Sequence, residues 1–311
     1  MGRKYTRTET IAQIEEAAKD MSTFYTATCI RRTGTTYKAD GARYYGARYY
    51  TEIISEYLLE HYDLFNQIQK IKRGNYKIGS HNGTTPRETS NRKEERIALA
   101  LAQKKVLNPL GEVIDYQVPL KSKQSDRAGK IDLMTFDEST GILRLIELKA
   151  PKSKETLLRC VLEIYTYYKT VDMNELLRSY GLDGKCKEVR ICPLFFKGST
   201  QNNEYNTLGN RRNLVGLMDK ISDDGIKVEL LRFPFENIET VSPSTSYANG
   251  VTGCDTPCTP GAIVIIPTVK SPNAAPLDLE EVPDCDTGTP SKWEIEILDC
   301  AYRLNAAGHK M

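Results

Sequence analysis

Apolar residues in the first third of the chain recur at helical spacing. Between residues 51 and 72 they repeat at about 3.6 residues, which predicts an amphipathic helix. The repeating positions are Ile54, Leu58, Leu59, Tyr62 and Phe65. Residues 74–90 are rich in Gly, Ser, Asn and Thr and predict a loop. Residues 1–88 are therefore expected to form a mainly helical N-terminal region.

The middle of the chain, residues 89–235, has the clearest alternation of helical and strand-like segments. Asn91 followed by Glu94 is typical of a helix start, and a helix is expected over residues 92–106. Strands are expected at 113–120, 130–136, 142–149, 189–196 and 226–233, and helices at 154–171 and 212–221. This order predicts an α/β fold with a central mixed sheet flanked by helices.

Composition changes after residue 235. Residues 236–311 hold eight of the 14 prolines, and Ser, Thr and Gly dominate residues 242–260. Such a segment is expected to be a loop-rich C-terminal tail. One strand at 261–269 and one short helix at 293–304 are predicted within it, and it carries no catalytic signature.

Charge is also unevenly distributed along the chain. The formal net charge is +2, but residues 1–90 carry +4, residues 91–235 carry +5 and the tail carries −7. Lys and Arg side chains release counterions from phosphates when they bind nucleic acid. The basic body therefore favours a polyanionic partner.

Several classes of protein are disfavoured by composition. No run of about 18 apolar residues exists, so a membrane-spanning helix is not expected and no membrane partner is predicted. Eight cysteines without a recognisable export signal are expected to be reduced thiols in the cytoplasm. Three histidines in all argue against a histidine-rich metal site.

Candidate chemistry lies in two short motifs of the predicted strands. They are Gly129-Lys130-Ile131-Asp132 and Glu147-Leu148-Lys149. Because side chains alternate along a strand, Asp132, Glu147 and Lys149 are expected on one face of a β-hairpin. Two carboxylates and one ammonium group would then converge there. The alternative is an exposed hairpin with an ordinary Glu–Lys pair.

The hairpin turn determines which residues face each other. Residues 137–140, Asp-Glu-Ser-Thr, are typical of a turn, and a four-residue loop would pair Phe136 with Gly141. Asp132 would then face Leu145 and lie one diagonal step from Glu147. A loop one residue longer would move Asp132 to the opposite face.

Two neighbouring carboxylates repel each other, and a divalent cation removes that repulsion. Ligation by oxygen alone favours Mg²⁺ or Mn²⁺ over zinc. Such a cation can bind a phosphate oxygen and lower the pKa of a bound water. A lysine beside it can orient that water or hold the phosphate. The hairpin therefore predicts phosphodiester chemistry.

These motifs and their order resemble the PD-(D/E)XK nuclease superfamily. Residues 129–132 are similar to the G-x-hydrophobic-D motif of its RecB-like branch, with Ile131 where the superfamily name has proline. That branch adds a Q-x-x-x-Y motif on the next helix, where this chain has Glu163 and Tyr167. The resemblance covers about residues 91–197. It implies a restriction-endonuclease-like core.

The function that the resemblance implies is a metal-dependent nuclease that hydrolyses nucleic acid, with DNA expected rather than RNA. Roles in bacterial or phage defence, restriction or repair are compatible with it. A homodimer is possible, since many restriction-type enzymes pair. The alternative is a catalytically inactive nucleic-acid-binding or interaction protein that keeps the fold. The presence of all three of Asp132, Glu147 and Lys149 argues against that alternative.

The resemblance also assigns residues to roles. Asp132, Glu147 and Lys149 are the expected catalytic residues, and Glu163 and Tyr167 are expected to support them. The expected Mg²⁺ or Mn²⁺ ligands are Glu94, Asp132, Glu147 and the main-chain carbonyl of Leu148.

Two further sets of residues are assigned around this centre. The family places an acidic residue on the first core helix, where Glu94 and Glu95 are adjacent. Glu94 is favoured because it shares a helix face with Ile97, Ala98 and Leu101. The residues expected to contact phosphates are Arg127, Lys130, Lys152 and Lys154.

Overall fold

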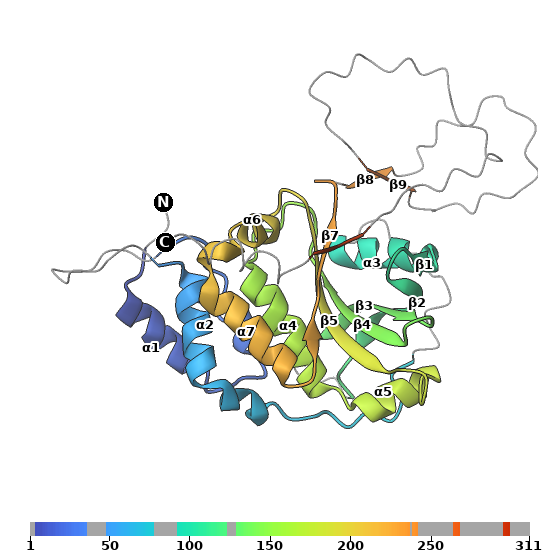
Figure 1. Ribbon diagram of the computed structural model, residues 1–311, viewed down its shortest axis with the longest axis horizontal. Helices are drawn as coiled ribbons and strands as arrows, with labels where there is room; N and C mark the ends of the chain where they lie inside the picture. Colours follow the sequence, from blue (N-terminus) through green and yellow to red (C-terminus); the bar gives the residue numbers. More distant parts are fainter. Residues whose placement is uncertain are drawn as a thin grey trace, which may run out of the picture.

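A mixed β-sheet forms the centre of the computed structural model, which describes residues 4–35, 48–77, 92–122, 129–236, 238–241, 264–267 and 295–298. The strand order is β1-β2-β3-β4-β5-β7-β10, with β6 beside β5 (Figure 1). Strands β1 to β4 are antiparallel neighbours, β4, β5 and β7 are parallel, and β10 is antiparallel to β7. The expected α/β class with a mixed sheet is confirmed.

The strands have these bounds: β1 Val106–Leu107, β2 Gly111–Pro119, β3 Lys130–Asp137, β4 Ile142–Leu148, β5 Glu188–Phe196, β6 Lys227–Val228, β7 Leu230–Phe233, β8 Ile238–Val241, β9 Val264–Pro267 and β10 Glu296–Leu298. The α-helices are α1 Arg7–Ala17, α2 Tyr50–Glu60, α3 Lys93–Gln103, α4 Leu157–Thr170, α5 Met173–Tyr180, α6 Thr200–Asn206 and α7 Arg212–Asp223. Three 3₁₀-helices are η1 Phe24–Thr26, η2 Tyr62–Gln67 and η3 Leu208–Asn210. Each expected core element is present, whereas α5, α6 and β1 were not predicted.

Helices cover both faces of the sheet (Figure 1). Helix α4 lies on one face with α2 and α7 outside it, and α3 lies on the other. Leu143 and Leu145 of β4 belong to the larger hydrophobic cluster, with the residues of α4. Ile146 and Leu148 belong to the smaller cluster, with the residues of α3. Every residue of β4 is buried, as expected for a central strand covered on both sides.

The N-terminal helices pack against the core through apolar and polar contacts. Ile14 of α1 and Ile53 of α2 lie in the same hydrophobic cluster as the sheet residue Leu145. The Glu52 carboxylate accepts hydrogen bonds from the first-turn N–H groups of α7, at 3.0 Å from Asn213 and 2.9 Å from Leu214. A carboxylate there satisfies unpaired donors and opposes the positive end of the helix dipole.

The helix expected over 51–72 is shorter than predicted. Helix α2 ends at Glu60 and is followed by the 3₁₀-helix η2. Its C-cap, His61, leaves helical geometry, and its ring Nδ1 lies 2.9 Å from the Tyr57 carbonyl oxygen. Phe65 is nevertheless buried, because a 3₁₀-helix with three residues per turn keeps apolar positions on one side.

The predicted turn of the central hairpin is displaced by one residue. The strands pair Asp137 with Ile142, so the loop is 138–141 and not 137–140. Asp137 stays in β3 because its carboxylate accepts hydrogen bonds from the Ser139 N–H at 3.0 Å and the Thr140 hydroxyl at 2.7 Å. Gly141, with φ of 73°, closes the turn. Since both strands shift by one residue, the side chains keep their faces.

The prediction of a short helix at 293–304 is wrong for residues 296–298, which form strand β10. Arg232 of β7 donates to Glu296 at 2.7 Å, and Ile295 is buried in the smaller hydrophobic cluster. Pairing with the free edge of β7 satisfies main-chain groups that a helix would have satisfied internally. The strand expected at 261–269 contains β9, which pairs with β8.

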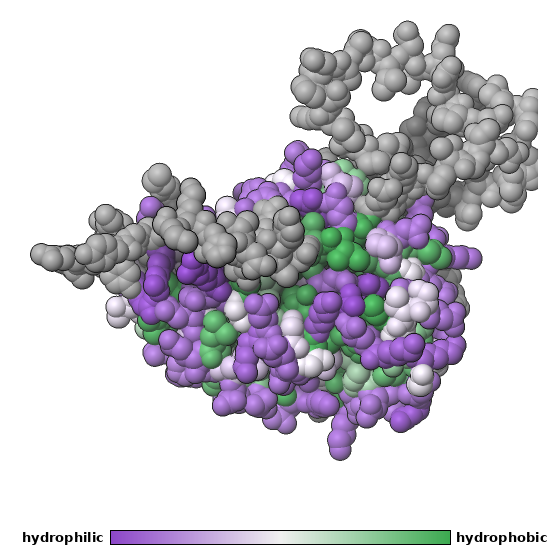
Figure 2. All heavy atoms as spheres, viewed as in Figure 1, coloured by the Kyte–Doolittle hydropathy of each residue, from purple (hydrophilic) through white to green (hydrophobic). Residues whose placement is uncertain are grey.

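The surface in view is mostly hydrophilic (Figure 2). Among the described residues, no helix has the length and apolar character required to cross a membrane.

The capping contact between α2 and α7 can be tested by mutation. Glu52→Ala is expected to lower the free energy of unfolding by about 1–2 kcal/mol, because two main-chain N–H groups lose their acceptor. Urea unfolding followed by circular dichroism measures this change. Glu60→Ala removes the same charge at the exposed end of α2, and its expected effect is below about 0.5 kcal/mol. Equal stabilities of the two variants would contradict the capping role.

Candidate active site

The candidate site lies where β3 and β4 separate. The last paired residues are Leu133 and Ile146, so the register places Asp132 opposite Glu147 rather than Leu145. Beyond this pair the Asp132 carboxylate takes the place of a main-chain acceptor. Its Oδ2 accepts a hydrogen bond from the Leu148 N–H at 2.9 Å. Asp132 is thereby fixed near Glu147, whose pKa its charge helps to raise.

A second hydrogen bond orients Asp132 from β2. The Gln117 side-chain amide donates to Asp132 Oδ1 at 2.7 Å. Gln117 has φ of 50°, a conformation that non-glycine residues adopt rarely and that is concentrated at functional sites. Burial raises the pKa of Asp132 to about 7, against the opposing effects of the Leu148 N–H and Lys149. The sequence motif gave no sign of Gln117.

Lys149 lies at the centre of a buried group of charges. Its Nζ is 2.7 Å from Glu147 Oε1, 2.9 Å from Glu163 Oε2 and 2.9 Å from Glu155 Oε2. Burial alone lowers the pKa of Lys149, but the charges of Glu147 and Glu163 outweigh it and raise that pKa well above its ordinary value. The ammonium group is therefore charged and surrounded by carboxylates.

Glu147 and Glu163 differ although both contact Lys149. Burial and the charge of Glu163 raise the pKa of Glu147 well above its ordinary value. For Glu163, burial is outweighed by Lys149 and Arg159, which lower its pKa. The lowered pKa favours the charged form of Glu163, which acts as a counter-ion of Lys149. Glu147 is the carboxyl that gains most from an additional cation.

Tyr167 connects this group to the N-terminal helices. Its hydroxyl donates to Glu163 Oε1 at 3.0 Å and lies 3.4 Å from the Tyr25 hydroxyl of η1. Gly129 makes room for it, because a Cβ there would lie 2.2 Å from the Tyr167 hydroxyl oxygen. The glycine of the first motif and the tyrosine of the helix motif therefore pack directly on each other. Tyr25 was not identified from the sequence.

Glu94 and Glu95 have different partners. Glu94 Oε1 accepts a hydrogen bond from the Ala150 N–H at 3.2 Å, and its charge contributes to the raised pKa of Asp132. Glu95 forms an ion pair with Arg92 at 3.2 Å, near the start of α3. Glu94 is thus the carboxylate that α3 directs toward the strand ends, as its helix face predicted.

Whether a divalent cation fits this site depends on which carboxylate oxygens have no hydrogen-bond partner and can ligate it. Glu147 Oε2 is buried and has no hydrogen-bond partner among the described residues. Within the same residues, no group of three or more His, Cys, Asp and Glu side chains is arranged to hold a metal ion. Mg²⁺ is commonly held by one or two carboxylates and several waters. Asp132 and Glu147 fit that requirement, and the charge of Glu94 acts on Asp132.

Three of the remaining predicted site residues, all lysines, lie on the surface. Lys130, Lys152 and Lys154 are exposed and therefore accessible to phosphates in solution, and Lys152 has φ of 61° in the turn after β4. Leu148 is buried, with its N–H committed to Asp132. Arg127 lies outside the described residues.

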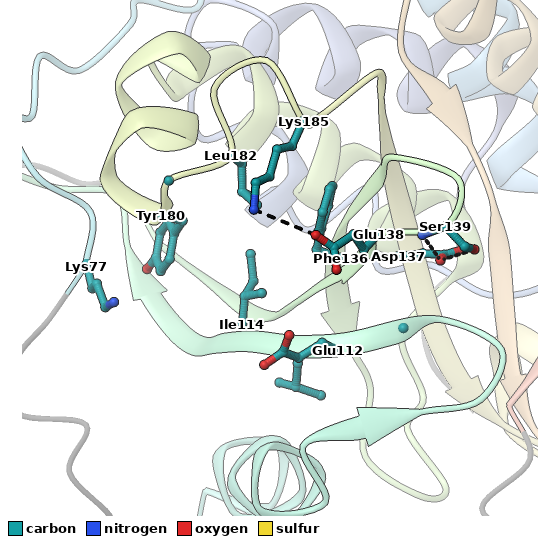
Figure 3. Close-up of a pocket in the computed structure, with 13 residues that line it drawn as sticks. Lys77, Glu112, Ile114, Phe136, Asp137, Glu138, Ser139, Tyr180, Leu182 and Lys185 are labelled. Atoms are coloured by element: carbon teal, nitrogen blue, oxygen red, sulfur yellow. Dashed lines mark hydrogen bonds and ion pairs between the residues drawn. The ribbon is translucent and has the colours of Figure 1, made fainter.

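A surface pocket of about 560 Å³ lies at the opposite end of β3 (Figure 3). It is lined by residues that include Phe136, Tyr180 and Glu112, with Lys185 paired to Glu138 at 3.7 Å. Its charges are mixed, and none of the predicted catalytic residues lines it. The pocket is therefore separate from the candidate site.

Neither a protein-family model nor a curated protein nor a solved structure matches the chain. The assignment of function therefore depends on the residues and their geometry.

The close approach of Tyr167 to Gly129 predicts a steric effect. Gly129→Ala is expected to displace the Tyr167 ring and lower the free energy of unfolding by about 1–3 kcal/mol. Gly74→Ala is the control, because a Cβ at Gly74 meets nothing within 4 Å. Thermal and urea unfolding measure both variants. A Gly129→Ala protein as stable as the control would show that the approach is not restrictive.

The raised pKa of Asp132 predicts a pH dependence of stability. Between pH 3.8, the ordinary value, and about 7 the folded protein holds a proton that the unfolded chain has lost. The contribution of Asp132 to the free energy of unfolding without metal should therefore fall as pH rises through this window. Asp132→Asn should flatten that fall, and Mg²⁺ should stabilise the wild type near pH 7 but not the variant. Urea titrations at several pH values, with Mg²⁺ or EDTA, measure both effects, and an unchanged slope in Asp132→Asn would contradict the assignment.

Proposed function

We propose that the protein is a divalent-cation-dependent nuclease that hydrolyses phosphodiester bonds, with DNA as substrate. The observation that carries the proposal is the buried oxygen Glu147 Oε2, which has no hydrogen-bond partner in the described part of the chain and lies in the group formed with Asp132 and Lys149. An unpaired buried carboxylate oxygen is costly unless a ligand completes it. The order of the motifs, which resembles PD-(D/E)XK nucleases, agrees with a metal ion as that ligand.

Each residue has a distinct role in this proposal. Asp132 and Glu147 hold Mg²⁺ or Mn²⁺, with Glu94 as a further oxygen donor. The cation supplies electrostatic stabilisation to a phosphate oxygen and acidifies a bound water. Lys149 positions the attacking water or the phosphate, and Glu163 keeps the ammonium group in place. Gln117 and the Leu148 N–H fix the orientation of Asp132.

The surroundings of the site support a nucleic acid as substrate. The exposed Lys130, Lys152 and Lys154 flank the strand ends and provide charge for phosphates. Residues 1–235 carry an excess of positive charge, whereas the tail is acidic. An inactive binding protein would not need a buried lysine surrounded by three carboxylates, since such a cluster is expensive to bury.

The proposal is tested by plasmid cleavage and by metal binding of two variants. Wild type should cut DNA with Mg²⁺ and not with EDTA. Glu147→Gln should lose both Mn²⁺ affinity, measured by calorimetry, and cleavage. Lys149→Ala should keep Mn²⁺ affinity or increase it, because one repulsive charge is gone, and should cleave about 10²–10³-fold more slowly.

Closed circular and linear substrates distinguish internal from end-dependent cleavage. Wild-type-like cleavage by either variant would mean that this hairpin is not the active site. Circular dichroism of each variant confirms that lost activity does not reflect unfolding.

A further inference from the structure

One carboxylate of the Lys149 group differs from the others in exposure. The side chain of Glu155 is 28% exposed, whereas those of Glu147 and Glu163 are 5% and 9% exposed. Glu155 precedes the N-cap of α4, at the end of the turn that carries Lys152 and Lys154. Glu155 is therefore the most exposed of the three carboxylates, although its Oε2, which faces Lys149, is itself buried.

Glu155 bridges two cations. Its Oε1 lies 2.7 Å from Arg159 Nη1, and its Oε2 lies 2.9 Å from Lys149 Nζ. Arg159 is one turn further along α4, and its side chain is 11% exposed. A carboxylate with one oxygen on each of two cations occupies the place in which a phosphate group would bind.

Arg159 also has an unused donor. Its Nε is buried and has no hydrogen-bond partner among the described residues, and the nearest carboxylate oxygen, Glu163 Oε2, is 3.8 Å away. A buried guanidinium normally uses its donors, and Arg pairs well with phosphate through two parallel hydrogen bonds. The free Nε indicates that the geometry of Arg159 suits a ligand other than Glu155.

The main chain of Glu155 is held by contacts in which its carboxylate takes no part. Gln201 Nε2 donates to the Glu155 carbonyl at 2.9 Å, and the Glu155 N–H donates to the Ser153 hydroxyl at 3.3 Å. Rotation about the side-chain bonds of Glu155 therefore leaves both of these main-chain hydrogen bonds intact. Exchange of one carboxylate for one phosphodiester, each with a single negative charge, would leave the net charge of the site unchanged.

We propose that Lys149 and Arg159 form the binding site for a substrate phosphate, and that the Glu155 carboxylate occupies it until nucleic acid displaces it. This inference rests on the proposed nuclease function and adds a phosphate-binding residue, Arg159, and an internal competitor, Glu155. The competitor keeps two buried cations paired when no substrate is present. It also reduces affinity for nucleic acid, because the substrate must displace it.

Measurement of DNA binding tests the displacement of Glu155 by a substrate phosphate independently of catalysis. The probe is a short fluorescein-labelled DNA duplex, bound to the full chain with Ca²⁺ in place of Mg²⁺ and followed by anisotropy. Glu155→Gln should bind about three- to tenfold more tightly than wild type, the scale of one partly exposed ion pair. Glu175→Gln is the matched control, since Glu175 is similarly exposed and paired with an arginine of its own helix. It should change affinity little.

Arg159→Lys tests the second half of the site while keeping its charge. This variant should bind the duplex several-fold more weakly than wild type, and Glu155→Gln should give little gain in the Arg159→Lys background. Thermal unfolding shows whether each variant is folded. If Arg159→Lys does not fold, the affinity of Glu155→Gln for the duplex is by itself sufficient to test whether Glu155 is displaced.

The outcomes separate this inference from the proposed function. If wild type binds and cuts DNA while Glu155→Gln and Glu175→Gln have the same affinity for the duplex, the proposed displacement of Glu155 is wrong. The proposed nuclease function is then unaffected. If wild type neither binds nor cuts nucleic acid, both are wrong.

Discussion

The candidate site depends on one constraint, the burial of the Lys149 ammonium group at the end of β4. A buried charge is tolerated only when it is paired, and this one is paired with carboxylates from three positions. Glu147 comes from the same strand, Glu155 from the turn, and Glu163 from α4. The position of α4 on the sheet is therefore tied to the chemistry, because a shift of the helix would separate Glu163 from the lysine.

The same constraint extends to the N-terminal helices. Glu163 binds Lys149 through one oxygen and accepts a hydrogen bond from Tyr167 at the other, and the Tyr167 hydroxyl lies near Tyr25 of η1. The N-cap hydroxyl of α4, Thr156, donates to the Ile30 carbonyl at 2.8 Å. Tyr25 and Ile30, which are far from the site in the sequence, thus contact the helix that carries Glu163. The N-terminal helices support the helix that carries the counter-ion of Lys149.

The sequence predicted the central elements because their signals are local. Alternation in the hairpin placed Asp132 and Glu147 on one face, and the helical period separated Glu94 from Glu95. The turn was misplaced by one residue because a side-chain bond at Asp137 decides where the strand ends. Gln117 could not be found, because its contact with Asp132 depends on the register between β2 and β3, which shifts between Val113 and Asp115.

The central claim is that Asp132 and Glu147 hold a divalent cation beside Lys149. The most direct measurement is anomalous X-ray diffraction from crystals of the full chain soaked in Mn²⁺. The account predicts one strong peak within coordination distance of the Asp132 carboxylate and Glu147 Oε2, with Lys149 Nζ outside that distance. A peak only elsewhere, or no peak at a Mn²⁺ concentration that supports cleavage, would contradict it.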